Sequence, residues 1–184
     1  MAATDTEWYR AQAAVRSWLN NTYKVRTLAA DYFSPFDLYT PNGTRLEVKW
    51  SPFGVIARKC SRYSNGRRGW QFNIHRHGNI DNGNVDFYIL VCQPSQELVK
   101  IGFGTPIFLV VQSPITIPVV RLSLRTMLMK WGAKANAVEP LKAFDATRTE
   151  KDRERAFLQA NPVESPVAVG KRKARQAREK VQSA

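Results

Sequence analysis

Glu47 and Lys49 lie two positions apart in RLEVKWS, residues 45–51, a stretch with the apolar pattern of a β-strand. Residues i and i+2 of a strand point to the same face. The carboxylate and the ammonium group are therefore predicted to lie side by side, with the apolar residues of the stretch on the other face. Such an arrangement is either a surface ion pair or part of a metal-dependent site.

A second carboxylate, Asp37, lies ten residues before Glu47 in the stretch SPFDLYT. The Pro-Asn-Gly turn signal at residues 41–43 predicts a β-hairpin, and pairing across it brings Asp37 nearly opposite Glu47. Two carboxylates in a basic protein suit a hard cation that prefers oxygen ligands, such as Mg²⁺. With Lys49 beside them to orient water, the set suggests metal-assisted hydrolysis of a phosphodiester in nucleic acid.

The overall charge agrees with a polyanionic partner. The formal net charge is +13 and the pI is near 10.1, which favours nucleic acid first among polyanions. Cys60 and Cys92 form no CxxC pair, so neither a disulfide framework nor a zinc site is predicted. We expect a soluble, cytoplasmic protein, because the N-terminal stretch has no signal-peptide pattern and the most apolar segment is interrupted by polar residues and prolines.

Hydrophobic periodicity predicts an α/β (α+β) domain over residues 1–132, with a mixed central sheet flanked by helices. Helices are expected from Thr4 or Thr6 to Asn20-Asn21 and from Ser123 to residue 135. Strands are expected in the hairpin and over residues 70–77, 85–94, 99–104 and 107–112. Residues 133–184 are expected to form a charged helical extension with a partly disordered basic tail.

Asp37 followed by Glu47-Val48-Lys49 resembles the D…(D/E)xK signature of the PD-(D/E)xK, or restriction-endonuclease-like, nucleases, which include intron-associated homing endonucleases and Holliday junction resolvases. The resemblance covers residues 5–132 and implies a restriction-endonuclease-like core with Mg²⁺-dependent cleavage, Mn²⁺ being the substitute ion. It implies that Asp37 and Glu47 are metal ligands and that Lys49 positions water. One departure is that PFD stands where the family has PD.

Two further residues match positions of that family. Glu7 corresponds to an acid that some members place on the first helix, where it completes the metal shell. An acid in a first helical turn is also explained by the helix dipole alone. Gln71 follows the motif strand, where several branches keep a catalytic glutamine, and the alternative for it is an ordinary edge-facing side chain.

Basic residues suited to phosphate contacts gather in two segments. The loop after the motif strand contributes Arg58, Lys59, Arg62, Arg67 and Arg68, with Trp70 able to stack on a base and His75 facing the nucleic acid. The tail contributes Lys171, Arg172 and Lys173 as a basic arm. The alternative for the loop is a solvated basic segment, and the alternatives for the tail are contact with an anionic surface or a disordered end.

Three readings of the chain remain open at this stage. The first is a Mg²⁺-dependent endonuclease acting on DNA, with RNA not excluded. The second is a nucleic-acid-binding module that has the same fold and does not cut. The third is an interaction protein in which the ExK triplet is fortuitous. A homodimer or a higher homo-oligomer is compatible with all of them. Neither the oligomeric state, nor the structure of the substrate, nor the biological role follows from the residues.

Overall fold

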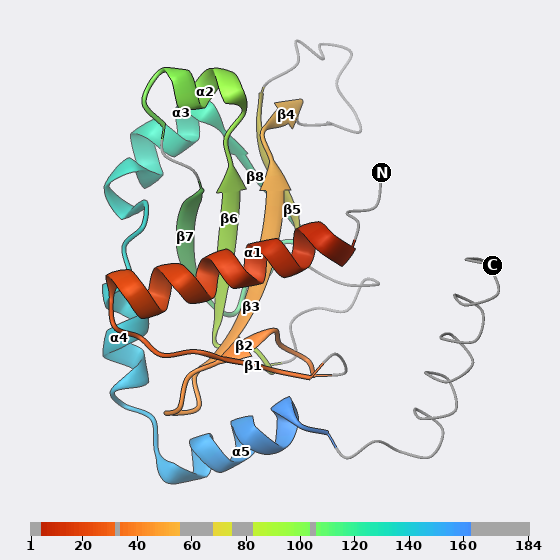
Figure 1. Ribbon diagram of the computed structural model, residues 1–184, viewed down its shortest axis with the longest axis vertical. Coiled ribbons are helices and arrows are strands. Elements are labelled where there is room, and N and C mark those ends of the chain that lie inside the picture. Colours follow the sequence, from red (N-terminus) through yellow and green to blue (C-terminus); the bar gives the residue numbers. More distant parts are fainter. Residues whose placement is uncertain (1–4, 32–33, 56–67, 75–82, 104–105, 163–184) are drawn as a thin grey trace, which may run out of the picture.

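The computed structural model describes residues 5–31, 34–55, 68–74, 83–103 and 106–162 (Figure 1). Its helices are α1 Asp5–Ser17, α2 Gln96–Lys100, α3 Leu124–Thr126, α4 Glu139–Asp145 and α5 Glu150–Ala160, with π-helical turns at Trp18–Thr22 and Met127–Trp131 and a 3₁₀ turn at Gly132–Lys134. Its strands are β1 Leu28–Ala29, β2 Leu38–Tyr39, β3 Arg45–Pro52, β4 Gly54–Val55, β5 Arg68–Asn73, β6 Phe87–Gln93, β7 Ile107–Gln112 and β8 Val119–Ser123.

The central sheet has five strands in the order β1-β2-β3-β6-β7. Strands β3 and β6 are parallel, whereas the other neighbouring pairs are antiparallel, so the sheet is mixed. The predicted hairpin is confirmed, because Leu38 of β2 pairs with Leu46 of β3. A second, antiparallel sheet has the order β4-β5-β8.

Two apolar layers cover the faces of the central sheet. On one face α1 crosses the strands (Figure 1), and Ala11, Val15 and Leu19 pack with Leu46, Val48 and the α4 residue Leu141. On the other face lie β5 and β8 of the second sheet, together with α5. There Trp70 and Phe72 pack against Tyr88 and Leu90 of β6. The fold is therefore a mixed α/β arrangement in which helices flank a mixed central sheet, as the periodicity predicted.

Two predicted elements differ from those observed. Residues 99–104 were expected to be a strand, and that prediction is wrong. Ser95 accepts a hydrogen bond from the backbone N–H of Leu98 and so caps α2, whose last residues include Val99 and Lys100. The helix expected from Ser123 begins there with the same kind of cap, but its α-helical part ends at Thr126 and continues as π and 3₁₀ turns.

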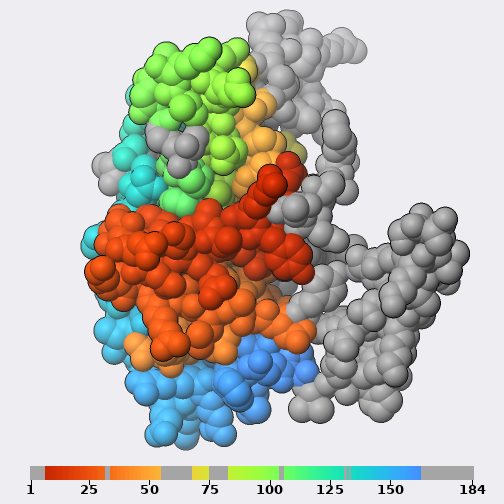
Figure 2. Space-filling model, in the orientation of Figure 1, coloured from red at the N-terminus to blue at the C-terminus, as the bar shows by residue number. Residues whose placement is uncertain are grey.

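The helices after residue 132 belong to the same core as the sheet. Leu141 of α4 is fully buried on the α1 side, and Ala156 and Ala160 of α5 are fully buried on the other side. Helix α5 begins with a capping box, in which the side chains of Thr149 and Asp152 each accept a hydrogen bond from the other residue's backbone N–H. The predicted boundary at residue 132 therefore does not separate two cores. Figure 2 shows α5 closing one end of the molecule.

The helices of the described ranges are short relative to a membrane span. Within the described ranges, none combines the length and the apolar character that crossing a bilayer requires.

Gly43, in the hairpin turn, is predicted to tolerate no side chain. Its φ is +91°, and a Cβ atom there would lie 2.6 Å from the backbone oxygen of Asp152 at the start of α5. Because the atoms that this Cβ would meet belong to the backbone of α5, a side-chain movement cannot relieve the clash. We expect Gly43→Ala to lower the free energy of unfolding by about 2 kcal/mol or more, measured by urea denaturation.

Gly54 is the matched control for that substitution. It lies in β4, and an added Cβ atom meets nothing within 4 Å. Gly54→Ala should therefore leave the urea midpoint nearly unchanged. Equal midpoints for the two variants would show that the turn and α5 are not held together as described.

Candidate active site

Glu47 and Lys49 lie side by side on β3. Lys49 Nζ donates to Glu47 Oε1 at 2.5 Å, and the two side chains are only 16% and 15% exposed. Their strand face is the one that carries Tyr88 and Leu90 of β6, which pair in register with Glu47 and Lys49 and are buried. The ion pair is thus partly enclosed by apolar groups, where electrostatic interactions are stronger than in bulk water.

Asp37 is held against the same segment of β3. Its Oδ2 accepts a hydrogen bond from the backbone N–H of Val48 at 2.7 Å, and its own N–H donates to the Leu46 carbonyl at 3.0 Å. Val48 is the residue between Glu47 and Lys49. The structure therefore brings together the three residues Asp37, Glu47 and Lys49, as the predicted hairpin pairing required.

The acids at this site suit a hard cation. A magnesium ion in a protein is commonly held by one or two carboxylates, with water and substrate oxygens completing its shell. An ionised carboxylate has about four acceptor positions, so the bond that Glu47 accepts from Lys49 and the bond that Asp37 accepts from Val48 are compatible with a cation at the same groups. Within the described ranges there is no group of three or more His, Cys, Asp or Glu side chains that could hold a metal. Among the described residues, Asp37 and Glu47 are therefore the pair of acids at this site that suits a magnesium ion.

Gln71 contacts β3 through its backbone. Its N–H donates to Ser51 Oγ at 3.0 Å, two positions beyond Lys49 on the same face of β3. Its side chain lies on the opposite face of β5 from buried Trp70, and its Oε1 accepts from Arg121 Nε at 3.2 Å. The structure thus brings the Gln71 backbone close to the site and pairs its side chain with an exposed arginine of β8.

Arg121 is a basic residue of this region that the sequence reasoning missed. Its proximity to Gln71 could not be inferred from the sequence, because β8 pairs with β5 over a separation of about fifty positions, in the register Gln71↔Arg121. The alternation in VVRLS, with Leu122 buried and Arg121 exposed, is the signal that would have placed it on an outer face.

Glu7 does not join the two carboxylates. It lines a cavity of about 350 Å³ with Arg10, Trp50 and Val91, on the α1 side of the sheet. Trp50 follows Lys49 in β3 and points to the opposite face. The prediction that Glu7 completes the metal shell is therefore wrong, because the sheet lies between this side chain and Glu47.

The structure describes two of the residues predicted to contact nucleic acid, Trp70 and Arg68. Trp70 is fully buried and its Nε1 donates to the Gln93 carbonyl, so the prediction that it stacks on a base is wrong. Arg68 is exposed, pairs with Glu97 at 3.0 Å and lies over the Phe53 ring. The other predicted contacts lie outside the described residues; they are Arg58, Lys59, Arg62, Arg67, His75, Lys171, Arg172 and Lys173.

Two other chemically notable groups belong to the framework. Asp86, the residue before β6, accepts hydrogen bonds from the backbone and side chain of Arg45 and from Arg148. Cys92 is buried in the core, and its desolvation raises the pKa of the thiol well above its usual range. A thiol that stays protonated is neither a nucleophile nor a metal ligand.

Comparison of the chain with protein-family models, with curated proteins and with solved structures finds no match. The site is therefore interpreted from its own geometry.

Proposed function

We propose that this protein is a Mg²⁺-dependent endonuclease that hydrolyses phosphodiester bonds in DNA, with a core of the PD-(D/E)xK type. The observation that carries the proposal is the arrangement on β3. A lysine and a glutamate share one face, and a second carboxylate is bound to the backbone of the residue between them. The basic character of the chain, with a net charge of +13, supports a polyanionic substrate.

The roles of the residues follow from their charges and positions. Asp37 and Glu47 would hold the cation, which when bound supplies Lewis-acid polarisation of the scissile phosphate. Lys49 would orient the attacking water and stabilise negative charge on the phosphate oxygens. Its bond to Glu47 fixes the ammonium group beside the acids, and the apolar neighbours of β6 reduce screening by solvent.

A second reading is a binding module that holds nucleic acid without cutting it. The charge favours that reading as strongly as it favours a nuclease. The acids favour cleavage, because two carboxylates beside a polyanion repel the phosphates unless a cation lies between them. Metal dependence therefore separates the two readings.

The test is a cleavage assay on plasmid, linear, branched and single-stranded DNA with Mg²⁺, Mn²⁺ or EDTA, comparing the wild type with Glu47→Gln. Glutamine keeps the size of the side chain and an oxygen for Lys49 but removes the negative charge. We expect metal-dependent cutting by the wild type and a loss of about 100-fold or more in the variant. Binding of Mn²⁺, followed by calorimetry, should weaken in parallel.

Glu154→Gln is the matched control, because it neutralises an exposed glutamate of α5 that belongs neither to β3 nor to the predicted phosphate contacts. It should cut at the wild-type rate. Tight, salt-sensitive DNA binding without cleavage and without Mn²⁺ binding would replace the nuclease proposal with the binding module.

A further inference from the structure

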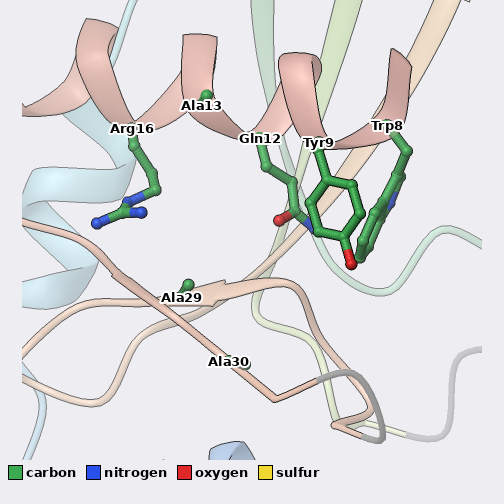
Figure 3. A pocket seen from close by; sticks show the side chains of 7 residues that line it. All are labelled: Trp8, Tyr9, Gln12, Ala13, Arg16, Ala29 and Ala30. Carbon is green, nitrogen blue, oxygen red and sulfur yellow. The ribbon is translucent and has the colours of Figure 1, made fainter. Parts of the chain in front are cut away.

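A cavity of about 360 Å³ lies between α1 and β1, on the α1 side of the sheet (Figure 3). Its size is at the lower end of the range for small-ligand sites in proteins. The helix contributes Trp8, Tyr9, Gln12 and Arg16, whose side chains extend toward β1. The opposite wall consists of alanines, so no large side chain fills the space between the two elements.

Gln12 is the unusual residue of this cavity. Its side chain enters the space between α1 and β1, and the residue is only 8% exposed. Its Nε2 is buried and has no hydrogen-bond partner among the residues that the structure describes. A buried amide without a hydrogen-bond partner is destabilising, because nothing compensates the loss of its hydration. A ligand that accepts a hydrogen bond in the cavity would remove that cost.

The other walls indicate which chemistry such a ligand has. Trp8 and Tyr9 meet edge to face with their ring centroids 4.9 Å apart, and Tyr9 is 56% exposed, so aromatic surface is open to a planar group. Arg16 is exposed and lies two helical turns along α1, about 12 Å from Trp8. A planar ring with acceptor atoms, joined to an anion, matches all three features, and a nucleotide has that composition.

The cavity adjoins the candidate active site through β1. The N–H of Ala30, which lines the cavity, donates to the carbonyl of Asp37 at 3.0 Å. The carboxylates face the other side of the sheet, and β1 is its edge strand, so a DNA strand that places one base in the cavity would reach them by passing around β1. We propose that this cavity holds one unpaired nucleotide of the substrate, so that the enzyme prefers DNA carrying an extrahelical base near the cut. This inference rests on the proposed function.

The test measures binding rather than cutting. Fluorescence anisotropy in EDTA compares three labelled duplexes: fully paired, with a one-nucleotide bulge, and with an abasic bulge that keeps the phosphate but has no base. We expect the bulged duplex to bind about tenfold more tightly than the other two. A free deoxynucleoside monophosphate serves as a competitor, to separate a strand-borne nucleotide from a free one.

Two substitutions should remove the preference. Gln12→Leu keeps the volume of the side chain but removes the amide, and Ala29→Leu fills the cavity from an exposed position of β1. The second variant tests the cavity even if the first fails to fold. Arg16→Ala should weaken binding of the bulged duplex, whereas Arg10→Ala, with the same change of charge on the other flank of α1, should leave the preference intact.

The outcomes separate this inference from the nuclease proposal. Cleavage by the wild type with equal binding of the three duplexes would overturn the nucleotide site and leave the nuclease standing. A bulge preference that Ala29→Leu abolishes, in a protein that cuts nothing, would support the site and overturn the cleavage. Binding of the free nucleotide without any bulge preference would also overturn the assignment to a DNA strand.

Discussion

Lys49→Ala is expected to lower the rate of metal-dependent DNA cleavage by about 10²–10⁴-fold, because it removes the group that orients water and balances charge on the phosphate. Both carboxylates remain, so Mn²⁺ should still bind. DNA affinity should change little, since one charge is lost from a chain with a net charge of +13. Single-turnover cleavage, Mn²⁺ calorimetry and a binding titration check these three expectations.

Lys100→Ala is the matched control, since it removes an exposed lysine from α2 and leaves β3 unchanged. It should cut at the wild-type rate. Lys49→Ala must be shown to fold, because its loss leaves Glu47, only 15% exposed, without its ammonium partner. A folded Lys49→Ala protein that cuts at full rate would exclude the proposed role of this lysine and reduce its pairing with Glu47 to a structural contact.

The hairpin that brings Asp37 to Glu47 was predictable from sequence because its signals are local. A Pro-Asn-Gly turn joins two short apolar segments, and strand alternation then determines which residues share a face. The observed pairing of Leu38 with Leu46 follows directly. Candidate sites built within one hairpin can therefore be read from spacing alone.

The misplaced residues depended on contacts between distant segments. The alternation around Trp70 showed that its face is apolar but not that the central sheet packs against it, so Trp70 was expected to stack on a base and is instead fully buried. Glu7 was expected at the metal because the sequence places it clearly on a helix. The direction in which that helix crosses the sheet depends on tertiary packing, which the local pattern does not reveal. Parallel pairing of β3 with β6 likewise joins residues about forty positions apart.

The C-terminal helices show the same limit. Residues 147–161 have many charges, and their buried contacts come from small residues, Ala156 and Ala160, which carry little weight in a hydrophobic pattern. Polar contacts also join this region to the sheet. Arg148 donates a hydrogen bond to Asp86, and Arg45 donates one to Gln159 of α5. A charged helix was therefore predicted correctly as a helix, but its place in the core was not.

This buried network predicts the largest loss of stability. The Asp86 carboxylate accepts hydrogen bonds from the backbone N–H, Nε and Nη2 of Arg45, at 2.8, 3.0 and 2.9 Å, and from Arg148 Nη2 at 3.2 Å. All three side chains are at most 14% exposed. Asp86→Ala would leave two guanidinium groups largely buried without this partner. We expect it to lower the free energy of unfolding by about 3–5 kcal/mol, a large share of the stability of a typical domain.

Urea denaturation followed by circular dichroism measures that loss, and Glu97→Ala is its control. Both variants remove one acid from a basic chain, but the Arg68–Glu97 pair is 53% and 75% exposed and should contribute less than about 1 kcal/mol. Because Asp86 joins the starts of β3 and β6 to the segment before α5, amide exchange in α5 should also accelerate in Asp86→Ala. Equal, small shifts of the two urea midpoints would mean that the network does not hold α5 to the sheet, and the C-terminal helices would then be an appendage of the core, as their charge pattern alone had indicated.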